Sequence, residues 1–243
     1  MKRRVRKHVP NAITCCNLFS GCVGVVFVFS DNPNGLIFGA YAIFLAAIFD
    51  FFDGLASRVL QSFSIIGKDL DSLADMISFG FLPSAILYEL FRQAPQIDHV
   101  SAYLNFIAFL IAVFSMLRLA KFNNDTRQKE SFIGLPTPAN AILVASLPFI
   151  LKQHPSFGPY ILNPYGLSCF VLIMCALLVA ELPLMSLKFK NRDFQANRFR
   201  YVLLLLSAIL ILFFKFAAVP VIIVMYVTLS VVQSRLTHDK ISG

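Results

Sequence analysis

Four aspartates in an otherwise apolar part of the chain have the spacing of a composite binding site. Asp50 and Asp53 are three residues apart, and Asp71 and Asp75 are four apart, so each pair shares one face of a helix. A carboxylate inside a membrane helix costs about 2.5 to 3.5 kcal/mol, and only two basic residues lie nearby in the sequence to balance the charge. Clustered carboxylates with too little counter-charge predict bound divalent cations, and hard oxygen ligands favour Mg²⁺, Mn²⁺ or Ca²⁺ over zinc.

The chemistry that such a site suits is phosphoryl transfer with two metal ions. Metal ions neutralise a pyrophosphate, and a positioned carboxylate removes the proton from a hydroxyl that is unreactive at neutral pH. Gly54 follows the second aspartate and Gly67 lies one turn before the third. A backbone without side chains at these points lets a bulky polar group such as a nucleotide approach.

The elements that carry these residues are expected to be membrane-spanning helices. The 243 residues are 58% hydrophobic and 14% charged, with far more apolar surface than one soluble core of this length buries. The sequence therefore predicts an all-α, polytopic transmembrane helical bundle. Counting runs of about 20 apolar residues, we expect about eight spans, at residues 12–30, 36–58, 70–91, 100–121, 137–152, 161–187, 200–215 and 217–233.

The distribution of positive charge supports this count and sets the orientation. With the N-terminus in the cytoplasm, 18 of the 21 Lys and Arg residues fall in cytoplasmic segments, as expected for short inside loops. Residues 200–233 form either one over-long helix or a hairpin broken near Lys215 and Pro220, and the hairpin keeps the C-terminal basic residues inside. We predict cytoplasmic termini, a multi-pass location in the cell inner (cytoplasmic) membrane with the active site at the cytoplasmic face, and no nucleic-acid partner.

A longer pattern around the aspartates resembles a known family signature. Residues 50–75 read D-x2-D-G-x3-R-x8-G-x3-D-x3-D, and this is similar to the D-x2-D-G-x2-A-R-x8-G-x3-D-x3-D signature of the CDP-alcohol phosphatidyltransferases, with Ser57 in place of the alanine. The resemblance implies attack of an alcohol oxygen on the phosphorus of CDP-diacylglycerol, with CMP leaving. It also implies a homodimer, metal ligation by Asp50, Asp53, Asp71 and Asp75, general-base action by Asp75, and nucleotide contacts from Gly54, Ser57, Arg58 and Gly67.

Three further stretches, 10–21, 70–88 and 118–141, resemble the phosphatidylserine synthases of bacteria and archaea, which implies L-serine as the acceptor. A zwitterionic amino acid needs a cation for its carboxylate and an acceptor for its ammonium. Lys121 stands where arginine is expected, which keeps the charge but loses bidentate recognition. The candidate acceptor contacts are Lys68, Ser78, Arg118, Lys121, Asn123, Gly134 and Pro136.

Other interpretations remain open at this stage. Basic residues after position 117 can equally bind the phosphate of glycerol 3-phosphate or inositol phosphate. Asn11, Thr14 and Asn17 recur on one side of the first helix, where they either contact the nucleotide or form hydrogen bonds between helices. An ion-coupled transporter is a distant alternative, which predicts acids at the bilayer midplane and repeated halves.

The domain organisation follows from the count of spans. We expect a single integral membrane domain over 1–243, in which 1–187 form a six-helix catalytic core and 200–233 add two C-terminal helices.

Overall fold

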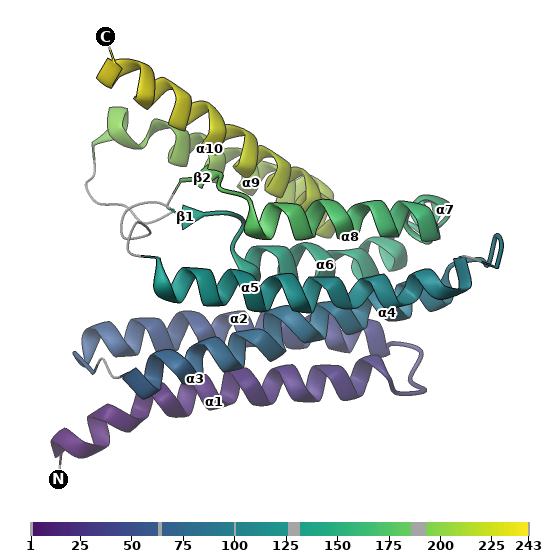
Figure 1. Ribbon diagram of the computed structural model, residues 1–243, viewed down its shortest axis with the longest axis horizontal. Helices are drawn as coiled ribbons and strands as arrows, with labels where there is room; N and C mark the ends of the chain where they lie inside the picture. Colours follow the sequence, from purple (N-terminus) through teal and green to yellow (C-terminus); the bar gives the residue numbers. More distant parts are fainter. Residues whose placement is uncertain (1, 63–64, 100, 126–131, 186–192, 243) are drawn as a thin grey trace.

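The computed structural model describes residues 2–62, 65–99, 101–125, 132–185 and 193–242. Its helices run back and forth along one long axis, and both chain termini lie at the same end of the molecule (Figure 1). The predicted all-helical class is confirmed, apart from one pair of two-residue strands.

The chain forms ten α-helices in the described residues, and short segments of other geometry connect some of them. The α-helices are α1 (Lys2–Val28), α2 (Gly35–Val59), α3 (Ile65–Asp75), α4 (Leu82–Gln93), α5 (Leu110–Asn124), α6 (Thr137–Gln153), α7 (Gly158–Ile161), α8 (Pro164–Val179), α9 (Phe194–Phe214) and α10 (Ala218–Ser242). The strands are β1 (Phe132–Ile133) and β2 (Pro183–Leu184), which pair antiparallel.

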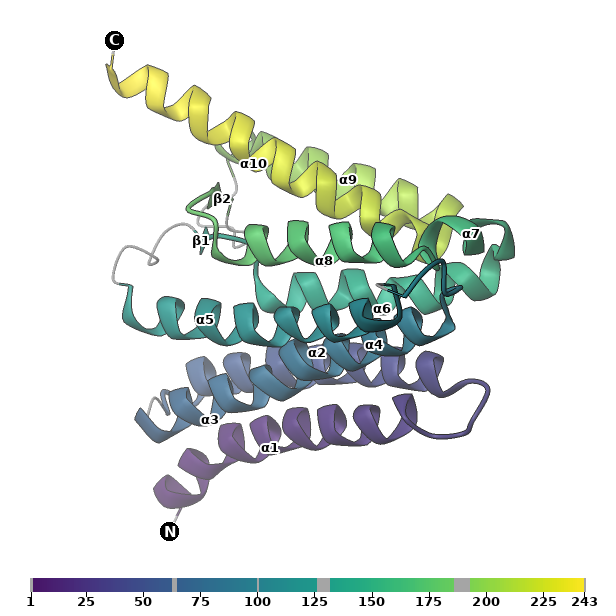
Figure 2. The ribbon, with the colours of Figure 1, turned by 45° about the vertical axis from the view of Figure 1, so that its right-hand side comes forward.

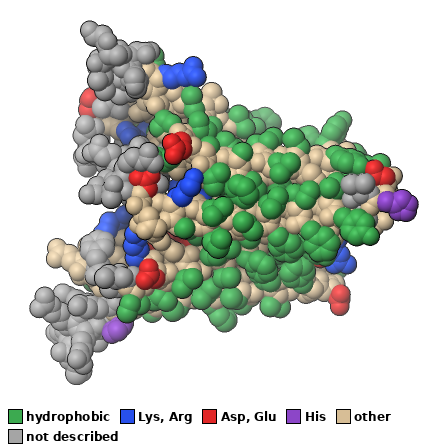
Figure 3. Space-filling view, in the orientation of Figure 1, with side chains coloured by type: hydrophobic (Ala, Val, Ile, Leu, Met, Phe, Trp, Pro, Cys, Tyr) green, Lys and Arg blue, Asp and Glu red, His purple; other side chains and the backbone are tan. Residues whose placement is uncertain are grey.

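The described helices suit a membrane-embedded bundle. Five of them are long and apolar enough to cross a membrane, or six if the pair Pro155–Ile161 and Pro164–Val179, bent by 73°, is one span. On the face that Figure 3 shows, hydrophobic side chains form a broad band across the middle, while charged side chains gather towards the ends. The eight-span count and the cytoplasmic termini stay predictions, because α6 has 17 residues and α9 with α10 count as one helical stretch by this measure.

Small residues let the first two helices approach closely. A Cβ on Gly39 would lie 2.4 Å from a methyl carbon of Val28, and one on Gly24 would lie 2.7 Å from Ala42. Close backbone approach through small residues is a common way to pack helices in lipid, where burial of apolar surface gives little driving force. The tight packing of α1 on α2 fixes the position of the polar residues on α1 relative to Asp53.

The third predicted span is one continuous helical stretch with a change of geometry in its middle. Helix α3 ends at Asp75, a π-helical segment covers Met76–Phe81, and α4 follows directly. The π segment is buried at Ser78, Phe79 and Gly80. Single π-helical turns inside α-helices occur frequently at functional sites, and here the turn follows the fourth aspartate.

The predicted helix over 161–187 is wrong at its C-terminal end. Helix α8 ends at Val179, and residues 180–185 are extended, with β2 at Pro183–Leu184. Proline disfavours helical geometry in the residue before it and has no N–H to donate, so Pro183 is incompatible with a helix continuing to 187. The extended segment instead pairs with β1.

The predicted hairpin at the C-terminus is present, with its break at Lys215. Lys215 has a positive φ of 50°, and a short 3₁₀ segment over Lys215–Ala217 joins α9 to α10. The N–H of Met185 donates to Ser230 of α10 over 3.1 Å. A straight helix would carry Ser230 about 54 Å from Phe194, beyond the roughly 32 Å that nine extended residues reach from Met185, so the two helices fold back side by side (Figures 1 and 2).

Candidate active site

The four aspartates of the sequence motif converge on one cavity of about 820 Å³. Its walls come from the last turns of α2, from α3, from the last turns of α5 and from the start of α6. The lining residues are Asp50, Phe51, Asp53, Gly54, Arg58, Asp71, Ser72, Asp75, Arg118, Leu119, Phe122, Asn123, Pro136, Thr137 and Pro138.

Three of these carboxylates are arranged to hold a cation. One oxygen each of Asp50, Asp53 and Asp71 lie within 4.8 Å of one another. Oδ1 of Asp71 is buried and has no hydrogen-bond partner among the described residues. Within the same residues, no lysine or arginine forms an ion pair with any of these three aspartates. Buried, unpaired charge is costly unless a counter-ion is bound, so this donor set fits a divalent cation with hard oxygen ligands.

Asp75 lines the same cavity but lies outside that group of three. Asp75 is only 8% exposed, and its Oδ1 accepts a hydrogen bond from Nδ2 of Asn17 over 3.1 Å. One oriented carboxylate beside a cluster of three others suits a group that accepts a proton from a substrate.

Two polar residues of α1 hold the carboxylates in place. The hydroxyl of Thr14 donates to Oδ2 of Asp53 over 2.7 Å, and Asn17 donates to Asp75 as above. Neither residue lines the cavity. Thr14 and Asn17 thus form hydrogen bonds between helices, which was one of the two roles considered for them, and both bonds reach carboxylates of the site. Asn11 is half-buried and also lies outside the cavity lining.

The motif residues of α2 and α3 that were expected to meet the nucleotide divide into two groups. Gly54 and exposed Arg58 line the cavity, and a Cβ built on Gly54 would meet no atom within 4 Å. That space leaves the backbone at Gly54 accessible to a bulky group. Ser57 and Gly67 are half-buried and lie outside the lining.

A chain of hydrogen bonds joins α3 to the end of α5 and borders the cavity. Nζ of Lys68 donates to the carbonyl of Asn123 over 2.7 Å, and Nδ2 of Asn123 donates to the hydroxyl of Ser72 over 2.7 Å. Lys68 and Asn123, both proposed as acceptor contacts, therefore link two helices. Ser72 was missed by sequence reasoning, although its place beside Asp71 in the motif is a usable signal.

Arg118 occupies the boundary between this cavity and a second one. It is 5% exposed, its Nε donates to the carbonyl of Leu135 over 3.1 Å, and its guanidinium lies 5.0 Å from the centre of the Phe122 ring. Within the described part of the chain, that Nε bond is its only hydrogen bond. Both Nη groups are therefore available to a ligand.

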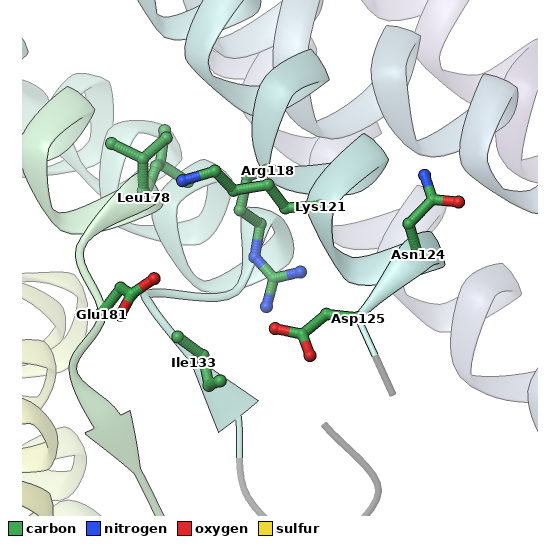
Figure 4. Close-up of a pocket in the computed structure, with 8 residues that line it drawn as sticks. Arg118, Lys121, Asn124, Asp125, Ile133, Leu178 and Glu181 are labelled. Atoms are coloured by element: carbon green, nitrogen blue, oxygen red, sulfur yellow. The ribbon is translucent and has the colours of Figure 1, made fainter. Parts of the chain in front are cut away.

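The second cavity has a volume of about 380 Å³ and mixed charge. Figure 4 shows Arg118 and Lys121 from α5 together with Asp125 beyond its end, and Glu181 opposite them after α8. Lys121 lines this cavity rather than the first. Asp125 and Glu181 were not predicted; a carboxylate within two residues of the end of each apolar helix was the signal that could have found them.

The remaining acceptor candidates have different surroundings. Pro136 lines the first cavity. Ser78 is fully buried and donates to the carbonyl of Asn17 over 3.0 Å, so it joins the π segment to α1. Gly134 has φ of 77°, its N–H donates to Leu182, and a Cβ there would lie 2.7 Å from the carbonyl oxygen of Leu178. A side chain is incompatible with that position.

Comparison with known proteins agrees with the site. The family model of CDP-alcohol phosphatidyltransferases matches residues 7–182, which include all four aspartates and both cavities. The chain belongs to the CDP-alcohol phosphatidyltransferase family. Proteins of this family generally use a divalent metal, in keeping with the arrangement of Asp50, Asp53 and Asp71.

Three curated relatives of this phosphatidyltransferase carry the name CDP-diacylglycerol–serine O-phosphatidyltransferase. The Bacillus subtilis protein is 33% identical over 147 residues, covering 58% of this chain and 76% of its own length. The Helicobacter pylori protein is 29% identical over 204 residues, covering 83% and 81%. The Saccharomyces cerevisiae protein is 30% identical over 176 residues, covering 66% and 59%.

Proposed function

We propose that this phosphatidyltransferase transfers the phosphatidyl group of CDP-diacylglycerol to L-serine, giving phosphatidylserine and CMP at the cytoplasmic face of the cell membrane. The observation that carries the proposal is the convergence of four carboxylates on a cavity next to a second cavity of mixed charge. The names of the curated relatives support the same substrates.

The proposed reaction is an in-line displacement at the phosphorus that bears diacylglycerol. The serine hydroxyl oxygen forms the new P–O bond, its proton passes to Asp75, and the P–O bond to CMP breaks. Two bound Mg²⁺ or Mn²⁺ ions would neutralise the pyrophosphate and the departing CMP. Asp50, Asp53 and Asp71 would hold these ions. Thr14 donates a hydrogen bond that fixes Asp53, and Asn17 donates one that orients Asp75.

The charges of the second cavity favour an amino acid over an acceptor that bears a phosphate. Arg118 and Lys121 supply two cations for a carboxylate, while Asp125 and Glu181 supply two anions for an ammonium. A phosphate group would meet the same two cations but would be repelled by the two carboxylates. Arg118 also borders the first cavity, so an amino acid on its guanidinium can direct its hydroxyl towards Asp75.

The test is CMP release by the purified protein with CDP-diacylglycerol and Mn²⁺ or Mg²⁺. L-serine, glycerol 3-phosphate, inositol and inositol phosphate are compared as acceptors. We expect release with L-serine alone. Release with one of the phosphate-bearing acceptors would keep the family chemistry and overturn the assignment of serine, and no release with any acceptor would overturn the proposed reaction.

Substitution Glu181→Gln should raise the KM for serine about tenfold, which corresponds to about 1.4 kcal/mol of binding. The change keeps the side-chain volume but removes the charge that faces the ammonium. The KM for CDP-diacylglycerol should stay unchanged, because Glu181 does not line the first cavity. Steady-state CMP release at varied serine measures both values.

A matched control is Glu89→Gln, which alters a glutamate near the end of α4 that pairs with Arg92 over 2.7 Å. It should leave the KM for serine at the wild-type value. If Glu181→Gln leaves that value unchanged too, the ammonium does not bind at Glu181.

A further inference from the structure

We propose that Tyr226 and Ser230 of α10 position the acceptor-binding Arg118 by anchoring two paired extended segments, one of which carries the Leu135 carbonyl that Arg118 binds. These segments, 132–136 and 180–185, are called here the acceptor strap. The inference rests on the proposed function, and it gives the C-terminal hairpin a role in acceptor recognition. The hairpin lies outside residues 7–182, which the family model matches.

The anchor is a pair of hydrogen bonds from α10 to one residue of the strap. The hydroxyl of Tyr226 donates to the carbonyl of Met185 over 3.0 Å, and the N–H of Met185 donates to the hydroxyl of Ser230 over 3.1 Å. Ser230 in turn donates to the carbonyl of Tyr226 over 2.7 Å. Both side chains are buried, at 7% and 1% exposure, so water does not compete for these bonds.

The strap transmits this anchoring from Met185 to Leu135. Next to Met185, β2 pairs with β1, and the N–H of Gly134 donates to the carbonyl of Leu182 over 3.0 Å. The N–H of Leu135 then donates to the carbonyl of Leu177, at the end of α8, over 2.9 Å. Leu135 is thereby held by the strand pair next to it and by its own N–H bond to α8, while its carbonyl accepts the bond from Arg118.

The last link fixes the guanidinium. The carbonyl of Leu135 accepts from Nε of Arg118 over 3.1 Å, the only hydrogen bond of that side chain within the described residues. A shift of the strap therefore moves or releases Arg118. Tyr226 and Asp75 both lie within electrostatic range of Arg118. The position of the hairpin therefore affects the position of Arg118, which lies between the two cavities.

The consequence expected of this arrangement is a specific loss of acceptor binding when the anchor is weakened. In Tyr226→Phe, the ring remains packed but the bond to Met185 is lost. The strap should become more mobile, and the KM for serine should rise about fivefold. The KM for CDP-diacylglycerol and the kcat at saturating serine should change less than twofold, because the carboxylates belong to α2 and α3.

A merely structural role for Tyr226 predicts a different result. General destabilisation reduces the fraction of active protein, so kcat falls while both KM values stay the same. The control is Thr228→Val, which removes a hydroxyl from the same helix, where it is exposed and donates only to Val224 within α10. Ser230→Ala should reproduce the effect of Tyr226→Phe, and Thr228→Val should not.

Hydrogen–deuterium exchange provides a readout that does not depend on turnover. In Tyr226→Phe and Ser230→Ala, peptides with the amides of Gly134, Leu135 and Met185 should exchange at least fivefold faster, with α2 peptides unchanged. Unchanged exchange in the strap, or faster exchange with an unchanged KM for serine, would overturn the inference. Absence of serine-dependent CMP release by the wild-type protein would instead overturn the proposed function, and the exchange result would still show whether α10 anchors the strap.

Discussion

Substitution Asp75→Asn should lower the kcat for serine-dependent CMP release by about 10²- to 10⁴-fold, the range that a positioned general base contributes. Asparagine is nearly isosteric and retains an oxygen that can accept the bond from Asn17. The amide cannot accept the proton of the serine hydroxyl. Asp75 lies outside the group of three carboxylates, so the concentration of Mn²⁺ that gives half-maximal activity distinguishes loss of the base from loss of the fourth ligand that the family resemblance implies: it stays at the wild-type value in the first case and rises in the second.

The matched control is Asp69→Asn, an exposed aspartate of the same helix outside the cavity lining. It should retain wild-type kcat. If Asp75→Asn retains more than a tenth of the wild-type kcat while it binds CDP-diacylglycerol normally, another group accepts the proton.

Substitution Asp71→Asn should separate metal binding from folding. In the wild-type protein, Mn²⁺ should raise Tm, because a ligand that binds the folded state stabilises it by about 2.7 kcal/mol at 100 times its Kd. In the variant this rise should be lost, since Oδ1 of Asp71 is the buried, unpartnered oxygen of the group of three. CMP release should fall at least 100-fold.

The metal-free protein gives the complementary result. Asp50, Asp53 and Asp71 repel one another when no cation is bound, so Asp71→Asn should unfold at the same or a higher temperature than the wild type in the presence of a chelator. Thermal unfolding in detergent with EDTA, then with Mn²⁺, measures both. A full Mn²⁺-dependent rise of Tm in the variant would contradict the role of Asp71 as a ligand.

The four aspartates are the part of the site that the sequence predicts best, because both their chemistry and their spacing point to one binding site. The pairs Asp50 with Asp53 and Asp71 with Asp75 lie on single helices, where spacing alone decides which side chains share a face. A short connection then makes the two helices neighbours. Their convergence on one cavity therefore followed from local rules.

The acceptor region could not be derived in this way, because its residues come from segments far apart in the sequence. Glu181 lies opposite Lys121 only because α8 ends at Val179 and the chain then pairs with β1. The expectation of a helix over 161–187 hid that turn. Sequence reasoning likewise made Gly134 an acceptor contact, whereas its positive φ and its close approach to Leu178 make it part of the strap.

The contacts between helices were also beyond the sequence. Ser78 stands in a stretch that suggested acceptor binding, yet its hydroxyl joins the π segment to Asn17 of α1. Equally, the polar residues of α1 could be predicted to face inward, but not that Thr14 and Asn17 would select different aspartates. Such choices depend on the rotation and depth of one helix against another.

The π segment over Met76–Phe81 sets the angular phase between the two halves of the third span. Each residue of an α-helix turns the chain by about 100°, and a π turn accommodates one more residue than an α turn. If the same residues were wound as a regular α-helix, Asp71 and Asp75 would be rotated by about that angle relative to the buried face of α4, which includes Leu82, Ile86 and Leu90. The extra residue thus lets one helix aim its carboxylates at the cavity while its continuation aims its apolar residues at the core.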